Sequence, residues 1–227
     1  MEKQSAIMVV STNANPAKED AYNQWYDEHV KLIFTYPGMQ RISRNRCLRP
    51  LGDAGENSPR YITIYELNDK EDIENFFRSS QMQEAKTQFD EGWPGLGDVL
   101  WSGWYEPVRT LERKPITTKR YTEIVGSGPK PGKDTDYLDY YTHHFTDMFE
   151  YGGIINISYV YCFQPLAQES RYPGYITVYD FENEKALDDF YRDPIFTGAK
   201  KEWDEVGQPA MDLQWAACYE SVITLLK

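Results

Sequence analysis

Residues 23–47 read NQWYDEHVKLIFTYPGMQRISRNRC, and an altered copy of this stretch recurs later in the chain. The copy, LDYYTHHFTDMFEYGGIINISYVYC, spans residues 138–162 and aligns without gaps at a constant offset of 115 positions. The alignment places His29 over His144. Because similarity at a fixed offset is the signature of an internal repeat, the sequence predicts a duplicated domain.

Two further segments repeat in the same order. PRYITIYEL (59–67) matches PGYITVYDF (173–181), and LWSGWYEPVRTL (100–111) matches QWAACYESVITL (214–225). The similarity therefore extends to both ends of each copy.

The joint between the copies is PVRTLERKPITT, which is polar and contains two prolines, as is typical of a connecting segment. We therefore predict a first repeat over residues 1–110, a second repeat over residues 117–227, and a linker over residues 107–118.

The first repeat alternates strand and helix patterns. Short β-branched and aromatic runs predict strands over 6–11, 39–48, 60–67 and 98–108. Apolar residues three and four positions apart predict a helix over 22–36, and a second helical pattern over 70–91 is interrupted near RSSQ. This order, β-α-β-β-α-β, is the ferredoxin-like arrangement, an antiparallel sheet with both helices on one face.

The free face of such a sheet needs a cover, and the second copy can supply it. The predicted fold class is α+β, with two ferredoxin-like repeats forming an intramolecular α+β barrel. Duplication also predicts a monomer, or a homodimer of duplicated chains. Cavities are expected between each sheet and its own helices.

Composition narrows the function. The 227 residues carry a net charge of −12, which repels nucleic acid. No apolar run approaches a membrane span or a signal peptide, so we expect no membrane partner and a cytoplasmic location. The cysteines, Cys47, Cys162 and Cys218, are odd in number and lack CxxC spacing, which favours packed thiols over a disulfide framework or a metal site. Sequence motifs of nucleotide-binding proteins, zinc proteases and serine hydrolases are absent.

All three histidines, His29, His143 and His144, lie in the repeated segment. An imidazole titrates near neutral pH, so it can take and return a proton without a metal. The alternative is a neutral imidazole hydrogen-bonded within the core. Their shared placement favours His29, His144 or both as catalytic residues.

Aromatic residues surround these histidines, and an aromatic wall excludes water and holds a flat substrate. An arginine facing inward can hold a carboxylate or an enolate, although an edge charge in water is the usual case. The predicted substrate-binding residues are Trp25, Tyr26, Tyr36, Arg44, Tyr140, Tyr141 and Tyr151.

The segment WYDEHV followed by YPGM resembles the W-Y-x-x-H...PG signature of the dimeric α+β barrel superfamily, particularly its EthD-like members, and the resemblance covers both halves. Members include cofactor-free isomerases, lyases and monooxygenases, and also haem-binding enzymes. Methylmuconolactone isomerases and bacterial chalcone isomerases place a functional histidine on this helix, which corresponds to His29 and His144. The resemblance therefore implies a histidine enzyme without a cofactor, while a haem with an axial histidine stays open.

The leading hypothesis is a cofactor-free acid/base enzyme, an isomerase or lyase, that forms an enol or enolate of a small aromatic oxygenated molecule. Such a role fits the catabolism of aromatic compounds. One alternative is a cofactor-independent monooxygenase of the EthD-like type. The other is a non-catalytic small-molecule-binding or stress-response barrel.

Overall fold

A computed structural model describes residues 4–116, 119–166 and 172–227. The first half follows the predicted order, with its second helix in two pieces. Its elements are β1 (Ala6–Ala14), α1 (Glu19–Phe34), β2 (Met39–Pro50), β3 (Tyr61–Leu67), α2 (Ile73–Arg78), α3 (Ser80–Gly92) and β4 (Gly97–Glu112), with short 3-10 turns at Pro16–Lys18, Asp53–Asn57 and Lys70–Asp72. The predicted interruption falls at Ser79, whose hydroxyl accepts a hydrogen bond from the Met82 amide and so caps α3.

The second half repeats this order. Its elements are β5 (Tyr121–Pro129), α4 (Asp134–Phe149), β6 (Ile154–Pro165), β7 (Tyr175–Phe181), α5 (Glu184–Phe190), α6 (Pro194–Glu202), a π-helical turn (Trp203–Gly207), α7 (Gln208–Ala210) and β8 (Met211–Leu226). α1 and α4 each bury tyrosines on the face toward the sheet, Tyr22 and Tyr26 in one helix and Tyr137, Tyr140 and Tyr141 in the other.

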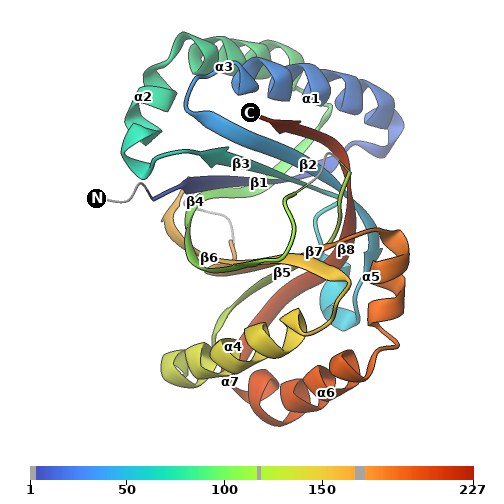
Figure 1. Cartoon of the computed structure of the whole chain (residues 1–227). Coiled ribbons are helices and arrows are strands. Elements are labelled where there is room, and N and C mark those ends of the chain that lie inside the picture. Colours follow the sequence, from blue (N-terminus) through green and yellow to red (C-terminus); the bar gives the residue numbers. More distant parts are fainter. Residues whose placement is uncertain (1–3, 117–118, 167–171) are drawn as a thin grey trace.

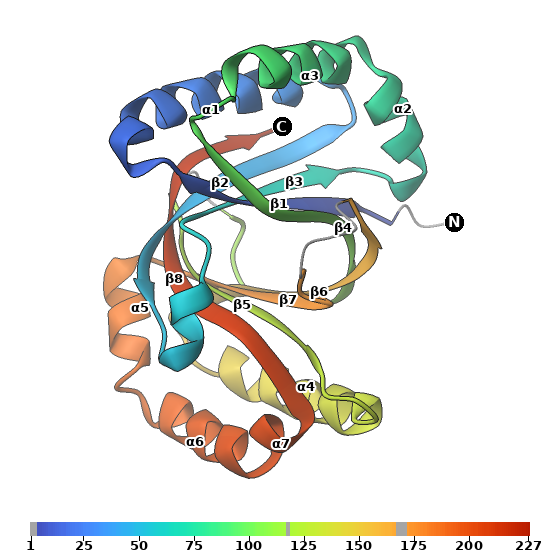
Figure 2. The same ribbon diagram turned by 180° about the vertical axis from the view of Figure 1, so that it is seen from behind.

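The eight strands close into one antiparallel barrel in the order β1-β3-β2-β8-β5-β7-β6-β4. Each half supplies a four-stranded sheet, and the halves join where β2 pairs with β8 and β4 pairs with β6. Helices α1 to α3 lie outside one sheet and α4 to α7 outside the other (Figures 1 and 2). The predicted α+β barrel within a single chain is confirmed.

The long strands β4 and β8 carry apolar side chains from one half to the other. Leu111 on β4 packs on the helix-side core of the second half, and Ile223 and Leu225 on β8 pack on that of the first. Residues 107–112, predicted as linker, are therefore strand, with exposed and half-buried positions alternating. Of the predicted linker, residues 117–118 lie outside the described residues.

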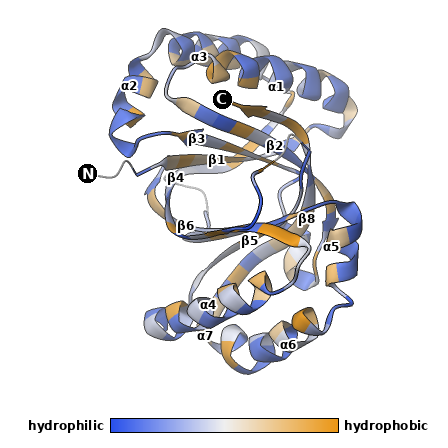
Figure 3. Ribbon diagram, viewed as in Figure 1, coloured by the Kyte–Doolittle hydropathy of each residue, from blue (hydrophilic) through white to orange (hydrophobic). Residues whose placement is uncertain are grey.

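A third core fills the barrel interior. Trp101 and Trp215, at equivalent repeat positions, stack there with their ring centroids 6.2 Å apart. This shared core covers the face that a single ferredoxin-like sheet would leave exposed. Among the described helices, none is long and apolar enough to cross a membrane, and hydrophilic residues are spread over both helical layers (Figure 3).

Two matched hydrogen bonds connect the halves. The buried Tyr105 hydroxyl donates to the Pro173 carbonyl at 2.9 Å, and the buried Tyr219 hydroxyl donates to the Pro59 carbonyl at 2.9 Å.

We expect Tyr105→Phe and Tyr219→Phe each to lower the free energy of unfolding by about 1–3 kcal/mol, because each leaves a carbonyl unpaired. Urea unfolding measures this. Similar losses for the two variants, additive in the double variant, are expected from the symmetry; a loss confined to one variant would contradict it.

Candidate active site

Each half contains one cavity between its sheet and its helices, as predicted. The first has a volume of about 220 Å³ and the second about 390 Å³. The first is lined by Met8, Val10, Thr12, Trp25, Tyr26, His29, Ile33, Tyr65, Phe77, Met82, Phe89, Trp93, Val99, Ser102 and Leu166. The second is lined by Leu51, Gly52, Glu123, Val125, Tyr140, Tyr141, His144, Met148, Tyr179, Phe196, Ala199, Lys200, Trp203, Met211, Leu213 and Ala216.

The two cavities occupy equivalent places in the repeat. Both are lined by the helix histidine, by the tyrosine three positions before it, and by a valine of the first strand, Val10 or Val125. Because the backbone around the two cavities is equivalent, their chemistry differs only through the side chains that line them.

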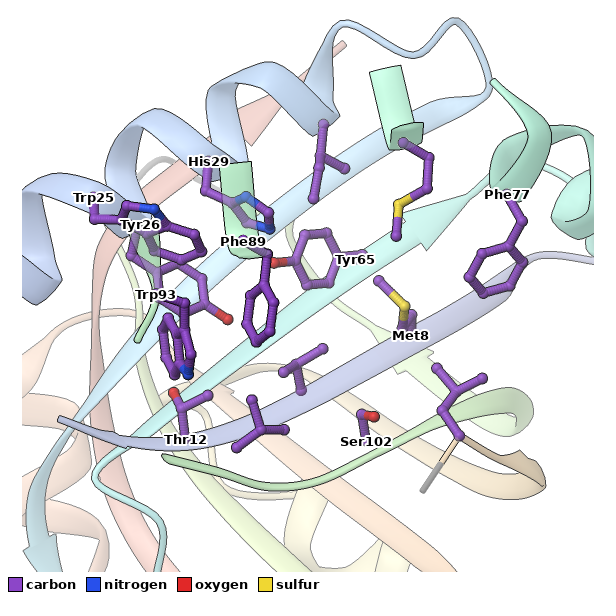
Figure 4. Close-up of a pocket in the computed structure, with 15 residues that line it drawn as sticks. Met8, Thr12, Trp25, Tyr26, His29, Tyr65, Phe77, Phe89, Trp93 and Ser102 are labelled. Carbon is purple, nitrogen blue, oxygen red and sulfur yellow. The ribbon is translucent and has the colours of Figure 1, made fainter. Parts of the chain in front are cut away.

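His29 points into the first cavity, between Tyr26, Phe89 and Tyr65 (Figure 4). Its ring stacks on Trp25 with centroids 4.6 Å apart, and its Nδ1 lies 2.9 Å from Gln88 Oε1. Since that oxygen only accepts, Nδ1 carries the proton and Nε2 is left as an acceptor. Burial lowers the pKa of His29, so this imidazole is neutral at neutral pH.

His144 has the same place in the second cavity but a different partner. Its ring stacks on Tyr140 with centroids 4.9 Å apart, and its Nδ1 lies 3.0 Å from the Tyr140 hydroxyl. Burial lowers the pKa of His144 to about 4, which makes the imidazole neutral and a weak base at pH 7. The neighbouring His143 is exposed and does not line this cavity.

Glu123 is a candidate functional residue that the sequence reasoning missed. It lies on β5, is 8% exposed, and its side chain lines the second cavity. Burial raises its pKa to about 7, although the Tyr191 hydroxyl, which donates to Glu123 Oε2 at 2.6 Å, and the charge of Arg49 both lower it. A carboxyl that ionises near neutral pH is suited to accept and return a proton.

The polar group around Glu123 exists in the second half alone. Tyr191 also contacts the Cys218 sulfur at 3.1 Å, and the three residues together form the acidic cluster Glu123, Tyr191 and Cys218. The repeat alignment places Met8, Phe77 and Trp104 at these positions of the first half. The first half therefore has apolar side chains at all three positions. The second cavity has an ionisable carboxyl where the first has none.

The predicted substrate-binding residues divide into two groups. Trp25 and Tyr26 line the first cavity, and Tyr140 and Tyr141 line the second. Tyr36, Arg44 and Tyr151 line neither cavity, and their role in substrate binding stays a prediction.

Tyr36 and Tyr151 follow the last turns of α1 and α4, outside the two cavities. The Tyr36 hydroxyl donates to Asp72 Oδ2 at 2.7 Å, and the Tyr151 hydroxyl donates to the Ala186 carbonyl at 2.9 Å. Both hydroxyls hold the first helix against the segment after the third strand.

Arg44 is 1% exposed and points under α1. Its guanidinium lies 4.7 Å from the ring centre of Tyr26 and 4.6 Å from that of Tyr61, and it donates to Asn23 and Asp27 at 2.6 and 3.2 Å. The guanidinium of Arg44 is therefore occupied by cation–π contacts and an ion pair within the first half.

The lining residues fit neither a metal nor haem. Within the described ranges, no group of three His, Cys, Asp or Glu side chains could hold a metal ion. A haem needs an axial nitrogen together with cations for its carboxylates. The described lining of the first cavity contains no Lys or Arg. The second contains His144 and one cation, Lys200, but it also buries the Glu123 carboxyl, which would repel the carboxylates of a haem when ionised. We derive no step through haem.

Comparisons with known proteins support the fold. Neither models of protein families nor curated proteins match the sequence. An anthrone oxidase-like protein of known structure superposes with a TM-score of 0.66 at 14% identity, over 99% of this chain and 93% of that one. A structure described as a "putative monooxygenase" from Fusobacterium nucleatum superposes with a TM-score of 0.65 at 11% identity, over 100% of this chain and 99% of that one.

A structure described as a "putative chlorite dismutase" superposes with a TM-score of 0.59 at 11% identity, over 97% of this chain and 95% of that one. At these identities the likeness shows the fold. The chain has an α+β barrel fold built from two ferredoxin-like repeats, which is closed within one polypeptide and contains two unequal cavities.

Proposed function

We propose that the chain is a cofactor-independent enzyme in which Glu123 removes a proton from a small aromatic oxygenated substrate held in the second cavity. The observation that carries this proposal is the buried Glu123 carboxyl facing an aromatic cavity of about 390 Å³, with Tyr191 bonded to it. The resemblance of the first helix to EthD-like sequences supports the same class. Closure of the barrel by one chain supports a monomer as the working unit.

The substrate that fits this arrangement has an acidic C–H next to a carbonyl. The Glu123 carboxylate takes this proton, and the electron pair moves to the carbonyl oxygen to give an enolate. If the Tyr140 hydroxyl donates to His144 Nδ1, the imidazole proton lies on Nε2, where it can donate to the enolate oxygen. His144 is thus a neutral hydrogen-bond donor in this scheme and Glu123 is the base.

We propose that the enolate then reacts with molecular oxygen. For an activated CH₂ group, one oxygen atom becomes the new carbonyl, both hydrogens leave with the other oxygen atom as water, and no further reductant is required. The names of two neighbours of the same fold, an anthrone oxidase-like protein and a "putative monooxygenase", support this outcome.

The second candidate function is an isomerase or lyase, in which Glu123 returns the proton at another atom or the enolate expels a group. It is favoured by the same carboxyl, whose pKa of about 7 lets it act as both base and acid at neutral pH.

Oxygen consumption separates these functions. The purified chain is incubated with anthrone and with a panel of phenolic ketones and lactones, in air and under argon, beside enzyme-free controls. One O₂ consumed per carbonyl formed supports the monooxygenase. Conversion that continues under argon supports the isomerase or lyase. Binding without conversion of any compound would support a non-catalytic barrel and contradict both.

Tyr191→Phe should move the acid limb of the kcat/KM profile to higher pH by about one to two units, because one hydrogen bond to a charged group is lost. The Tyr191 hydroxyl stabilises the carboxylate form of Glu123, so its removal raises the pKa further. The variant copies Phe77 of the first half. Rates measured from pH 5 to 9 test this, and an unmoved limb would contradict Glu123 as the base.

A further inference from the structure

The first cavity has the size and surface of a binding site but lacks the ionisable groups of the second. Its described lining contains no Asp, Glu, Lys or Arg. Met8 and Phe77 stand where the second half has Glu123 and Tyr191. The first cavity therefore has no equivalent of the proposed base.

We propose that this first cavity is a second, non-catalytic binding site for a neutral phenol with one aromatic ring. The inference goes beyond the proposed function and does not rest on it, because it concerns the other half of the barrel and requires no reaction.

The volume sets the size of the ligand. A dry cavity of about 150 Å³ lined by apolar side chains holds benzene. The first cavity, at about 220 Å³, has room for a substituted ring, whereas the second cavity is nearly twice as large. Met8 and Met82 are unbranched and adapt to the outline of a ring.

The walls of the cavity select an aromatic ring. Trp25, Phe89 and Trp93 contribute ring faces or edges around the same space (Figure 4). Offset or edge contacts between such rings and a ligand ring stabilise a flat molecule beyond its apolar area.

The single neutral imidazole selects a hydroxyl group. His29 Nδ1 is bonded to Gln88, and within the described ranges Nε2 has no hydrogen-bond partner in the protein. A phenolic O–H can donate to this nitrogen. The described lining contains no Lys or Arg, and Arg44, which lies against Tyr26, is already paired with Asp27, so a buried carboxylate would lack a counter-charge.

The cavity also has a route to solvent. Val99 is 41% exposed and Leu166 is 37% exposed, and both line it. These two apolar side chains give an aromatic ligand a path into the cavity from solvent.

Binding of p-cresol, observed by ¹⁵N NMR of histidine-labelled protein, tests the inference. With three histidines in the chain, His29 reports on the first cavity and His144 on the second. We expect p-cresol to shift His29, toluene to bind about five- to tenfold more weakly because it lacks one hydrogen bond, and p-toluate to leave His29 unchanged.

The repeat supplies a matched pair of variants. Val10→Phe fills the first cavity and Val125→Phe fills the second, at equivalent positions. Val10→Phe should abolish the His29 shift, whereas Val125→Phe should leave the His29 shift unchanged. Val10→Leu, a smaller change, should weaken p-cresol binding in part if Val10→Phe fails to fold.

Three outcomes overturn the inference: no His29 shift in the wild-type chain at saturating p-cresol, a His29 shift that persists in folded Val10→Phe, or equal binding of p-toluate. Failure of the proposed function is distinguishable, because it would appear as full turnover in Glu123→Gln, whereas the His29 shift with p-cresol is measured without any reaction.

Discussion

Glu123→Gln is expected to lower kcat/KM by about 10²- to 10⁴-fold, the usual contribution of a positioned general base. Gln keeps the shape of the side chain and can still accept from the Tyr191 hydroxyl, but it cannot take a proton. The chemical step is therefore lost while the cavity keeps its outline. Turnover of whichever compound is converted in the oxygen assay measures the loss.

Met8→Gln is the matched control, because it places the same amide at the equivalent position of the first cavity. It should leave turnover unchanged. A Glu123→Gln variant with full activity would remove Glu123 from the mechanism. An equal loss in Met8→Gln would show that the loss comes from a general disturbance of the chain and not from the missing carboxylate.

Glu123→Gln should also raise the free energy of unfolding while it lowers activity. Burial raises the pKa of Glu123 from 4.5 to about 7, so the folded chain holds this proton more tightly than the unfolded chain. The resulting stabilisation is fully present below pH 4.5 and is lost as the pH rises through about 7. At pH 8 the ionised carboxyl costs about 3 kcal/mol at most, and Gln removes this cost. A destabilising group facing a cavity is the pattern expected of function.

The repeat made the fold predictable from the sequence. Aligned segments gave two β-α-β-β-α-β units, and the need to cover two sheets gave the barrel. The strand character of residues 107–112 was missed because the polar composition and the prolines masked an alternating pattern. That pattern becomes interpretable once β6 of the other half is known to be the partner strand.

The candidate site was predictable in part. The helix period placed His29 and His144 on the faces that line the cavities, and the structure confirms this position. Glu123 could have been found by extending the repeat alignment to the first strand of each half. There Glu123 aligns with Met8, within an otherwise apolar stretch. The role of Arg44 could not be predicted. Alternation along a strand shows which face a side chain is on, but not whether that side chain lines a cavity or packs against aromatic rings.

Asp180→Asn is expected to lower the free energy of unfolding by about 3–5 kcal/mol, as when one partner of a buried ion pair is removed. Asp180 is 1% exposed and accepts from Arg120 Nε at 3.0 Å and from Asn156 Nδ2 at 2.9 Å, while Arg120 is 2% exposed. The isosteric amide leaves the guanidinium buried without a counter-charge. For a chain of this size, the melting temperature should fall by roughly 6–20 °C.

The first half provides the control for this ion pair. Glu66 aligns with Asp180 and pairs with Arg41, but their side chains are 22% and 14% exposed, so water can solvate the charge that remains. Glu66→Gln should therefore cost about 1 kcal/mol or less. The double variant Arg120→Met, Asp180→Leu should recover most of the loss, because apolar side chains of similar volume replace buried pairs well. If Asp180→Asn and Glu66→Gln melt at the same temperature, burial does not set the cost of these charges.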